Sequence, residues 1–172
     1  KCQWCHENGR VPKRAKFDSP GTAPGPCEWT ACDSFKFVLN EMDIQLWGQI
    51  FLNLYSRRSF IYISEDHVPD GALTVRHLRQ YRRDAGLTDK ILSDNGREFD
   101  NVEVISFLGS HCVQQKFTSA EQPWQNGVCE RKIQYLKDIA TRVFHDMRGQ
   151  IEAGTISPVE TFYEINAALN ET

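Results

Sequence analysis

The sequence has no run of about 18 or more apolar residues, which is the length that a membrane-spanning helix needs. The most apolar stretch, residues 44–55, is interrupted by two glutamines, a glycine and an asparagine. We therefore expect no membrane-spanning segment. A signal peptide is also missing, and the chain begins with Lys1 rather than Met, so we expect it to be part of a longer protein.

Cysteine and net charge are also low. Six irregularly spaced cysteines in 172 residues are too few for a disulfide scaffold, so we expect a reducing compartment. The net charge of −3 disfavours a protein that coats nucleic acid over its whole surface, but it permits a small, locally basic site. With 40% apolar and 25% charged residues, the composition is ordinary for one folded domain, with or without a fragment of another.

Residues 1–27 differ from the rest of the chain. They contain Cys2 and Cys5, a basic cluster, and then three prolines and two glycines within residues 20–26. Such a segment leaves little room for a helix or a sheet ladder, so it is predicted to be a linker.

Regular patterns begin at Glu28 and predict five strands and four helices. The predicted strands are Glu28–Leu39, Leu46–Tyr55, Ser59–Ser64, Lys90–Ser93 and Cys112–Phe117. The predicted helices run from the N-cap Asp70 to about Asp84, over roughly Asn101–Ser110, from near Val128 onwards, and over Ser157–Leu169. This order predicts an α/β layer with one edge formed by hairpins.

Three acidic residues lie where an active site would be expected in such a fold. Asp33 lies inside the first strand, where a charged side chain is costly unless it is paired or holds a cation. Asp94 directly follows the fourth strand, where ligands collect in open α/β sheets. Glu130 lies in the first turn of the long helix, where the helix dipole alone can explain it. Each has an ordinary structural explanation, but together they can converge on one point and suit Mg²⁺ or Mn²⁺.

Two sequence motifs resemble those of a known family. Residues 93–99 (SDNGREF) resemble the second-aspartate motif of retroviral-type integrases, and residues 123–131 (PWQNGVCER) resemble their glutamate motif. Asp94 and Glu130 are separated by 35 residues, the spacing that names the D,D-35-E integrases.

Other segments are similar to one branch of that family, the copia-type LTR retrotransposons. These are residues 125–132 (QNGVCERK), residues 55–58 (YSRR), and residues 2–10 (CQWCHENGR), which resemble the end of a zinc-binding region. The resemblance covers the chain from about Lys1 to Phe144, and Asp33 is the best match to the first aspartate of the family.

The resemblance implies an RNase H-like fold, in which a five-stranded mixed sheet is flanked by helices. It places the integrase catalytic core at residues 28–148 and a helical extension of the core at residues 149–172. It also implies that Asp33, Asp94 and Glu130 hold two Mg²⁺ or Mn²⁺ ions for trimming DNA 3′ ends and joining them to target DNA.

Zinc contacts are implied by the same resemblance, and DNA contacts are predicted from the positions of residues in the loop and on the long helix. Cys2 and Cys5 can supply two of four zinc ligands, and the family's two histidines would precede Lys1, so Zn²⁺ is expected only in a longer parent chain. A zinc site that adds Cys27 and Cys32 is a weaker alternative, since Cys32 adjoins an aspartate in a strand. The residues expected to contact DNA are Asn126, Gly127, Arg131 and Lys137.

Two basic helix faces have alternative interpretations. Lys137 shares a helical face with Glu130, so it either neutralises a DNA phosphate or is a solvated lysine. A second basic face, between residues 76 and 83, is interpreted as solvated in preference to a DNA contact. It consists of Arg76, Arg79, Arg82 and Arg83.

The expected partners are element-end DNA, target DNA and further copies of the chain, since two DNA ends must be joined in concert. The resemblance implies a dimer or higher oligomer, located in the nucleus during integration and in a cytoplasmic virus-like particle before that. One alternative is another RNase H-like enzyme, such as a DDE transposase or a nuclease. The other is a catalytically decayed or co-opted domain that only binds DNA or protein.

Overall fold

A computed structural model describes residues 25, 27–65, 67–118 and 127–171. The strands are β1 (Trp29–Leu39), β2 (Ile44–Asn53), β3 (Ser59–Ser64), β4 (Lys90–Ser93) and β5 (Gln114–Phe117). The helices are the 3-10 helix η1 (Asn40–Met42), α2 (Gly71–Asp84), α3 (Val102–Ser110), α4 (Gly127–Asp146), α5 (Arg148–Glu152) and α6 (Pro158–Glu171). Within these described residues, none of the helices is both long enough and apolar enough to cross a membrane.

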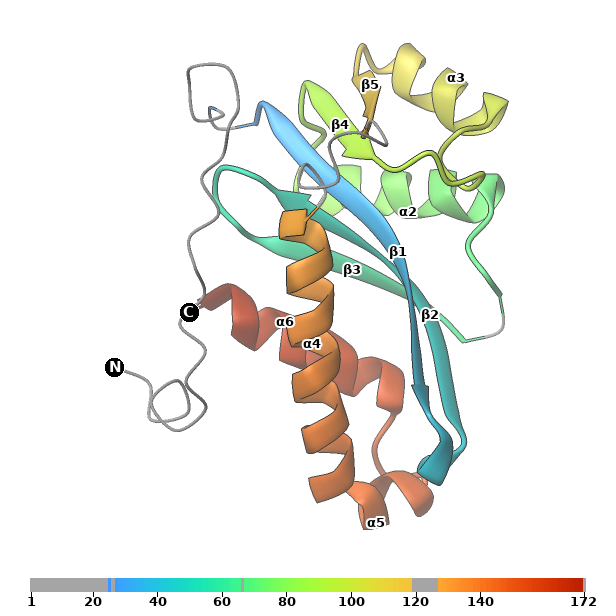
Figure 1. The fold of residues 1–172 in the computed structure, drawn as a ribbon, viewed down its shortest axis with the longest axis vertical. Coiled ribbons are helices and arrows are strands. Elements are labelled where there is room, and N and C mark those ends of the chain that lie inside the picture. Colours follow the sequence, from blue (N-terminus) through green and yellow to red (C-terminus); the bar gives the residue numbers. More distant parts are fainter. Residues whose placement is uncertain (1–24, 26, 66, 119–126, 172) are drawn as a thin grey trace.

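The five strands form one mixed sheet in the order β3-β2-β1-β4-β5. The first three strands pair antiparallel, whereas β4 pairs parallel to both β1 and β5. Helices α4 and α6 cover one face of this sheet, and α2 lies on the other (Figure 1). The predicted five-stranded mixed sheet with flanking helices is therefore confirmed.

The alternation of side chains along β1 separates two hydrophobic cores. Ala31, Phe35 and Phe37 pack with residues of α4 and α6, whereas Cys32 packs with residues of α2 and α3. Because successive side chains of a strand point to opposite faces, odd-numbered residues in this part of β1 face α4. This parity decides on which side of the sheet Asp33 lies.

Side-chain caps fix the starts of two helices, and the cap at Asp70 was predicted. Asp70 Oδ1 accepts a hydrogen bond from the Leu73 N–H at 2.8 Å, at the start of α2. Asn101 Oδ1 accepts one from the Val104 N–H at 3.0 Å, at the start of α3. Each cap satisfies a backbone donor that has no partner within its helix.

The second predicted strand is wrong at both ends, because β2 begins at Ile44 and ends at Asn53. The Asn53 side chain accepts hydrogen bonds from the backbone N–H groups of Tyr55 and Ser56, at 3.0 and 2.9 Å. An asparagine that bonds its own following backbone forms a turn, and this turn ends the strand.

The fifth strand begins two residues later than predicted, at Gln114. Cys112 has a φ angle of 57°, in the left-handed region, and the Val113 N–H donates to the Leu108 oxygen at 3.0 Å. These residues complete the end of α3 and cannot join the sheet. The short helix α5 was not predicted either.

Candidate active site

Asp33 lies on β1, and Asp94 directly follows the neighbouring parallel strand β4. Ala31 pairs with Leu92 in the β1–β4 ladder, and each aspartate comes two residues later in its own segment. Ala31 belongs to the core beneath α4 and α6. Because residues two apart on a strand share a face, Asp33 faces α4, and the register directs Asp94 to the same side.

Glu130 lies in the first turn of α4, on this face of the sheet. Its neighbour Cys129 is completely buried, and the Cys129 Sγ–H donates to the backbone oxygen of Ala31 at 4.0 Å. This contact holds the first turn of α4 against β1, two residues before Asp33. Glu130 itself is exposed.

The charges of the other acids act on the carboxyl group of Asp33. Burial raises the pKa of Asp33 from its ordinary value of 3.8 to about 7, and the charge of Asp94 adds to this shift. The Ser34 N–H, which donates to Asp33 Oδ1 at 2.8 Å, lowers the pKa, while Glu130 and Glu98 raise it further. The site therefore carries an excess of negative charge that a bound cation would relieve.

Glu98 is a nearby acid that the sequence analysis missed. A Cβ atom placed on Gly96 would lie 2.5 Å from Glu98 Oε2 and 3.0 Å from Asp94 Oδ1. The Gly96 N–H also donates to Asp94 Oδ1 at 3.0 Å. The turn at Gly96 thus brings the carboxylates of Asp94 and Glu98 against one short backbone segment. The available signal was the place of Glu98 inside the SDNGREF motif.

The donor set fits a hard divalent cation by its chemistry, since it consists of carboxylate oxygens. Within the described residues, no three His, Cys, Asp or Glu side chains are arranged to hold one metal ion together. The structure therefore brings the acids into electrostatic contact without forming a complete coordination shell.

Of the predicted DNA contacts, Lys137 lies within electrostatic range of Asp33. Its Nζ lies 5.9 Å from the centre of the Phe35 ring, and burial lowers its pKa while the charge of Asp33 opposes that shift. Arg131 is exposed on α4, and Gly127 is the first residue of that helix. Asn126 lies outside the described residues.

The zinc predictions fall mostly outside the described residues, as both Cys2 and Cys5 do. Of the two further cysteines in the weaker alternative, Cys27 is exposed and Cys32 is buried. The Cys32 Sγ–H donates to the Leu92 oxygen at 3.5 Å, and burial raises the pKa of the Cys32 thiol. Zinc binds the thiolate, so this environment disfavours Cys32 as a ligand.

Comparison with known proteins identifies the fold. No family model matches the sequence, and no curated protein matches it. The catalytic core domain of HTLV-2 integrase, solved in complex with magnesium in a trimeric form, has a TM-score of 0.66 at 13% identity, with 82% of this chain and 83% of that chain covered. The fold is that of an integrase catalytic core.

Two further structures support this fold. The catalytic core domain of BIV integrase has a TM-score of 0.61 at 15% identity, and the match covers 82% of this chain and 81% of that one. A chain of the simian T-cell lymphotropic virus intasome has a TM-score of 0.70 at 15% identity, and the match covers 96% of this chain but 55% of that one. The predicted RNase H-like integrase-core fold is therefore confirmed.

A buried polar network supports the integrase-core sheet beside Asp33. Gln49 is fully buried on β2, and its Nε2 donates to Thr74 Oγ1 at 2.8 Å and to Ser34 Oγ at 3.2 Å. Its Oε1 lies 2.8 Å from His77 Nδ1, which must therefore carry the proton. The network ties α2 to the residue that follows Asp33.

We expect this network to be sensitive to acid through His77. Burial lowers the pKa of His77 from 6.5 to about 4, and the charge of Arg76 contributes. The unfolded state binds a proton more readily than the folded state, so the contribution of His77 to stability falls as the pH drops from 6.5 towards 4, by about 2 kcal/mol between pH 7 and pH 5. Urea unfolding of the wild type and of a His77 variant at the two pH values isolates this contribution.

The matched variant is His77→Asn, whose amide can still donate to Gln49 Oε1 but cannot take up a proton. Its stability at pH 5, relative to pH 7, should be about 2 kcal/mol more favourable than that of the wild type. Equal changes in the two proteins would show that His77 does not contribute to the acid sensitivity.

Proposed function

We propose that this chain is the catalytic core of a copia-type retrotransposon integrase. It is a metal-dependent polynucleotidyl transferase, which trims DNA 3′ ends and joins them to target DNA. One observation carries the proposal. Asp33 and Asp94 each come two residues after the paired residues Ala31 and Leu92, and the charge of Glu130 raises the pKa of Asp33.

In this proposal Asp33, Asp94 and Glu130 hold two Mg²⁺ or Mn²⁺ ions. Such ions, when bound, activate the attacking hydroxyl and stabilise the leaving oxygen of a phosphodiester. The half-buried Lys137 on the same side of the sheet neutralises a DNA phosphate, and Asn126, Gly127 and Arg131 position the DNA. None of these contacts reads base sequence, which fits an enzyme that inserts DNA at many sites.

The finer parts of the proposal rest on sequence motifs. The copia assignment rests on residues 125–132, 55–58 and 2–10. The proposed domains are a zinc-region stub with linker at 1–27, the core at 28–148 and its helical extension at 149–172. The proposed partners are element-end and target DNA and further copies of the chain, in a virus-like particle and then in the nucleus. Zn²⁺ would bind Cys2 and Cys5 only in a longer parent chain.

Disintegration, the reversal of strand transfer on a branched DNA, tests the proposal directly. We expect the chain to release the joined strand with Mg²⁺ or Mn²⁺ and not with a chelator. Asp94→Asn and Glu130→Gln should each reduce the rate by about 100-fold or more, since even residues that only support metal ligands are worth about 10–100-fold.

The matched control is Glu160→Gln, because Glu160 is also an exposed glutamate in the first turn of a helix, α6. This variant should retain the wild-type rate. If the chain is inactive while Mg²⁺ raises the melting temperature of the wild type but not that of Asp94→Asn, the metal site is present. Disintegration would then require the flanking domains. No effect of Mg²⁺ on the wild type would instead favour the decayed or co-opted domain.

A further inference from the structure

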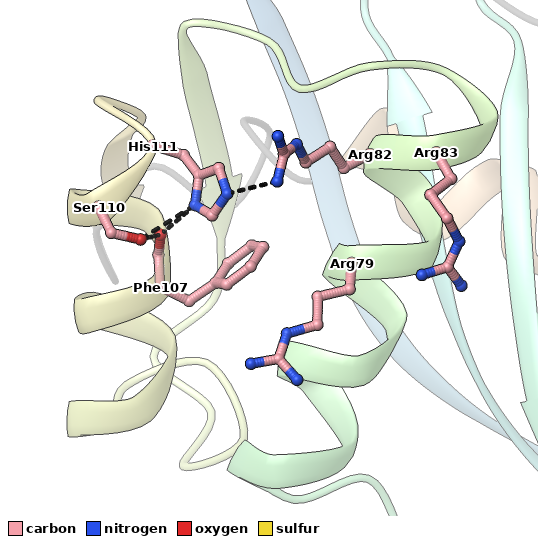
Figure 2. A pocket seen from close by; sticks show the side chains of 6 residues that line it. All are labelled: Arg79, Arg82, Arg83, Phe107, Ser110 and His111. Atoms are coloured by element: carbon pink, nitrogen blue, oxygen red, sulfur yellow. Dashed lines mark hydrogen bonds between the residues drawn. The ribbon is translucent and has the colours of Figure 1, made fainter.

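A basic pocket of about 550 Å³ lies between α2 and α3. Its lining residues are Arg79, Arg82, Arg83, Phe107, Ser110 and His111 (Figure 2). These helices cover the face of the sheet opposite to α4, and Ser110 and His111 stand at the C-terminal end of α3. Asp94 precedes the N-terminal end of α3, so the pocket is separate from the candidate active site.

Two of the arginines are positioned by α3. Arg82 reaches across to His111, and its Nη1 donates to His111 Nε2 at 2.8 Å (Figure 2). His111 Nδ1 lies 2.8 Å from the Phe107 backbone oxygen, which can only accept, so Nδ1 carries the proton and Nε2 is the acceptor. The Arg79 guanidinium lies 5.9 Å from the centre of the Phe107 ring. Neutral groups thus hold both cations in place.

Within the part of the chain that the structure describes, no acid forms an ion pair with the arginines of this pocket. Among the described residues, the ion pairs are Lys90–Glu28, His145–Glu41 and Arg148–Glu152, and none includes a pocket arginine. The nearest acid in sequence, Asp84, accepts a hydrogen bond from Tyr62 Oη at 2.9 Å. Three like charges within one and a half turns of a helix repel each other, and a bound anion would remove that cost.

We propose that this arginine pocket binds the phosphates of a nucleic acid backbone. This pocket proposal depends on the proposed function in one respect, which is that the ligand is DNA. Guanidinium groups match phosphate oxygens through paired hydrogen bonds, and the pocket is larger than a single ion needs. Phe107 is buried and lies beneath Arg79, so it offers no free ring for base stacking. The contact is therefore to the backbone and independent of sequence.

Salt-dependent DNA binding by two charge-matched double variants tests this pocket. The pocket variant is Arg82→Gln/Arg83→Gln, and the control is Arg58→Gln/Arg142→Gln, which also removes two exposed arginines but none on α2. Fluorescence anisotropy with a labelled duplex of arbitrary sequence gives the affinity of the 172-residue chain as the KCl concentration varies. EDTA is present throughout, so the result does not depend on the proposed metal site.

The pocket variant should bind DNA about tenfold more weakly than the wild type. Its slope of log affinity against log salt concentration should be shallower by about 1.8, because each of the two lost phosphate contacts contributes about 0.9. The control should keep the wild-type slope. Equal slopes for the two variants, or no binding by the wild type at low salt, would overturn the proposal. Selective loss of binding to a labelled polyglutamate peptide, with DNA binding unchanged, would also overturn it and would indicate an acidic protein partner.

Discussion

Replacing Phe162 with Ala is expected to lower the free energy of unfolding by about 3–5 kcal/mol, the usual cost of removing a buried phenyl ring. Phe162 on α6 is fully buried. Its ring centre lies 4.9 Å from that of Phe37 on β1 and 5.6 Å from that of Phe144 on α4. The substitution would leave a cavity where the sheet, α4 and α6 meet.

Urea unfolding of Phe162→Ala beside Glu164→Ala measures this contribution. Glu164 is exposed on the same helix, so its replacement should change stability by less than about 0.5 kcal/mol. A loss below about 1 kcal/mol in Phe162→Ala would mean that α6 is dispensable for the core.

Side chains at the far edge of the sheet give α6 a second attachment. Asn166 Nδ2 and Asn170 Nδ2 both donate to the Ser59 backbone oxygen, at 2.9 and 2.7 Å, and Ser59 begins β3. A chain that ended at residue 148 would lose these bonds together with the ring of Phe162. We therefore expect such a truncation to be unfolded or aggregated.

Elements whose signals are local could be predicted from the sequence. Strands β3 and β4 have the predicted bounds, since each is a short β-rich run between turn residues. The Asp70 cap could also be predicted, because a capping side chain bonds within its own helix turn. Helix α5 has none of these signals, since it has five residues, includes a glycine and buries no side chain.

Features that depend on distant parts of the chain could not be predicted in detail. The 35-residue spacing indicated Asp94 and Glu130, but their relation to Asp33 depends on the register between β1 and β4, which are far apart in sequence. The approach of Glu98 to Asp94 depends on the turn at Gly96. The arginine face of α2 was interpreted as solvated because a single helix pattern does not reveal that α3 packs beside it.

The second large effect concerns Asp33, where function and stability oppose each other. Burial and the charge of Asp94 raise the pKa of Asp33 to about 7, so the folded state holds a proton that the unfolded chain releases near 3.8. The folded state therefore loses stability as the pH rises from about 4 to about 7, and the loss persists above pH 7. Because Asp33 lowers the stability of the folded state, it is a candidate for a functional role rather than a packing role.

Asp33→Asn is expected to raise the free energy of unfolding at pH 8 by about 2–4 kcal/mol in metal-free buffer. The asparagine oxygen can still accept the hydrogen bond from the Ser34 N–H, so the variant removes the charge and little else. The gain should shrink as the pH falls and be small at pH 4, where the wild-type carboxyl is protonated in the folded state and about half protonated in the unfolded state. The same variant should lose disintegration activity.

Urea unfolding at pH 4, 6 and 8, with Asp89→Asn as the control for an exposed aspartate, measures this effect. The control should show no pH-dependent gain, since Asp89 lies in solvent. Mg²⁺ should stabilise the wild type at pH 8 more than Asp33→Asn, because the asparagine offers no charged ligand at this position while Asp94 and Glu130 remain. A variant that is less stable than the wild type at pH 8 would show that Asp33 is not held in a repulsive cluster of carboxylates, and the proposed metal site would lose its main support.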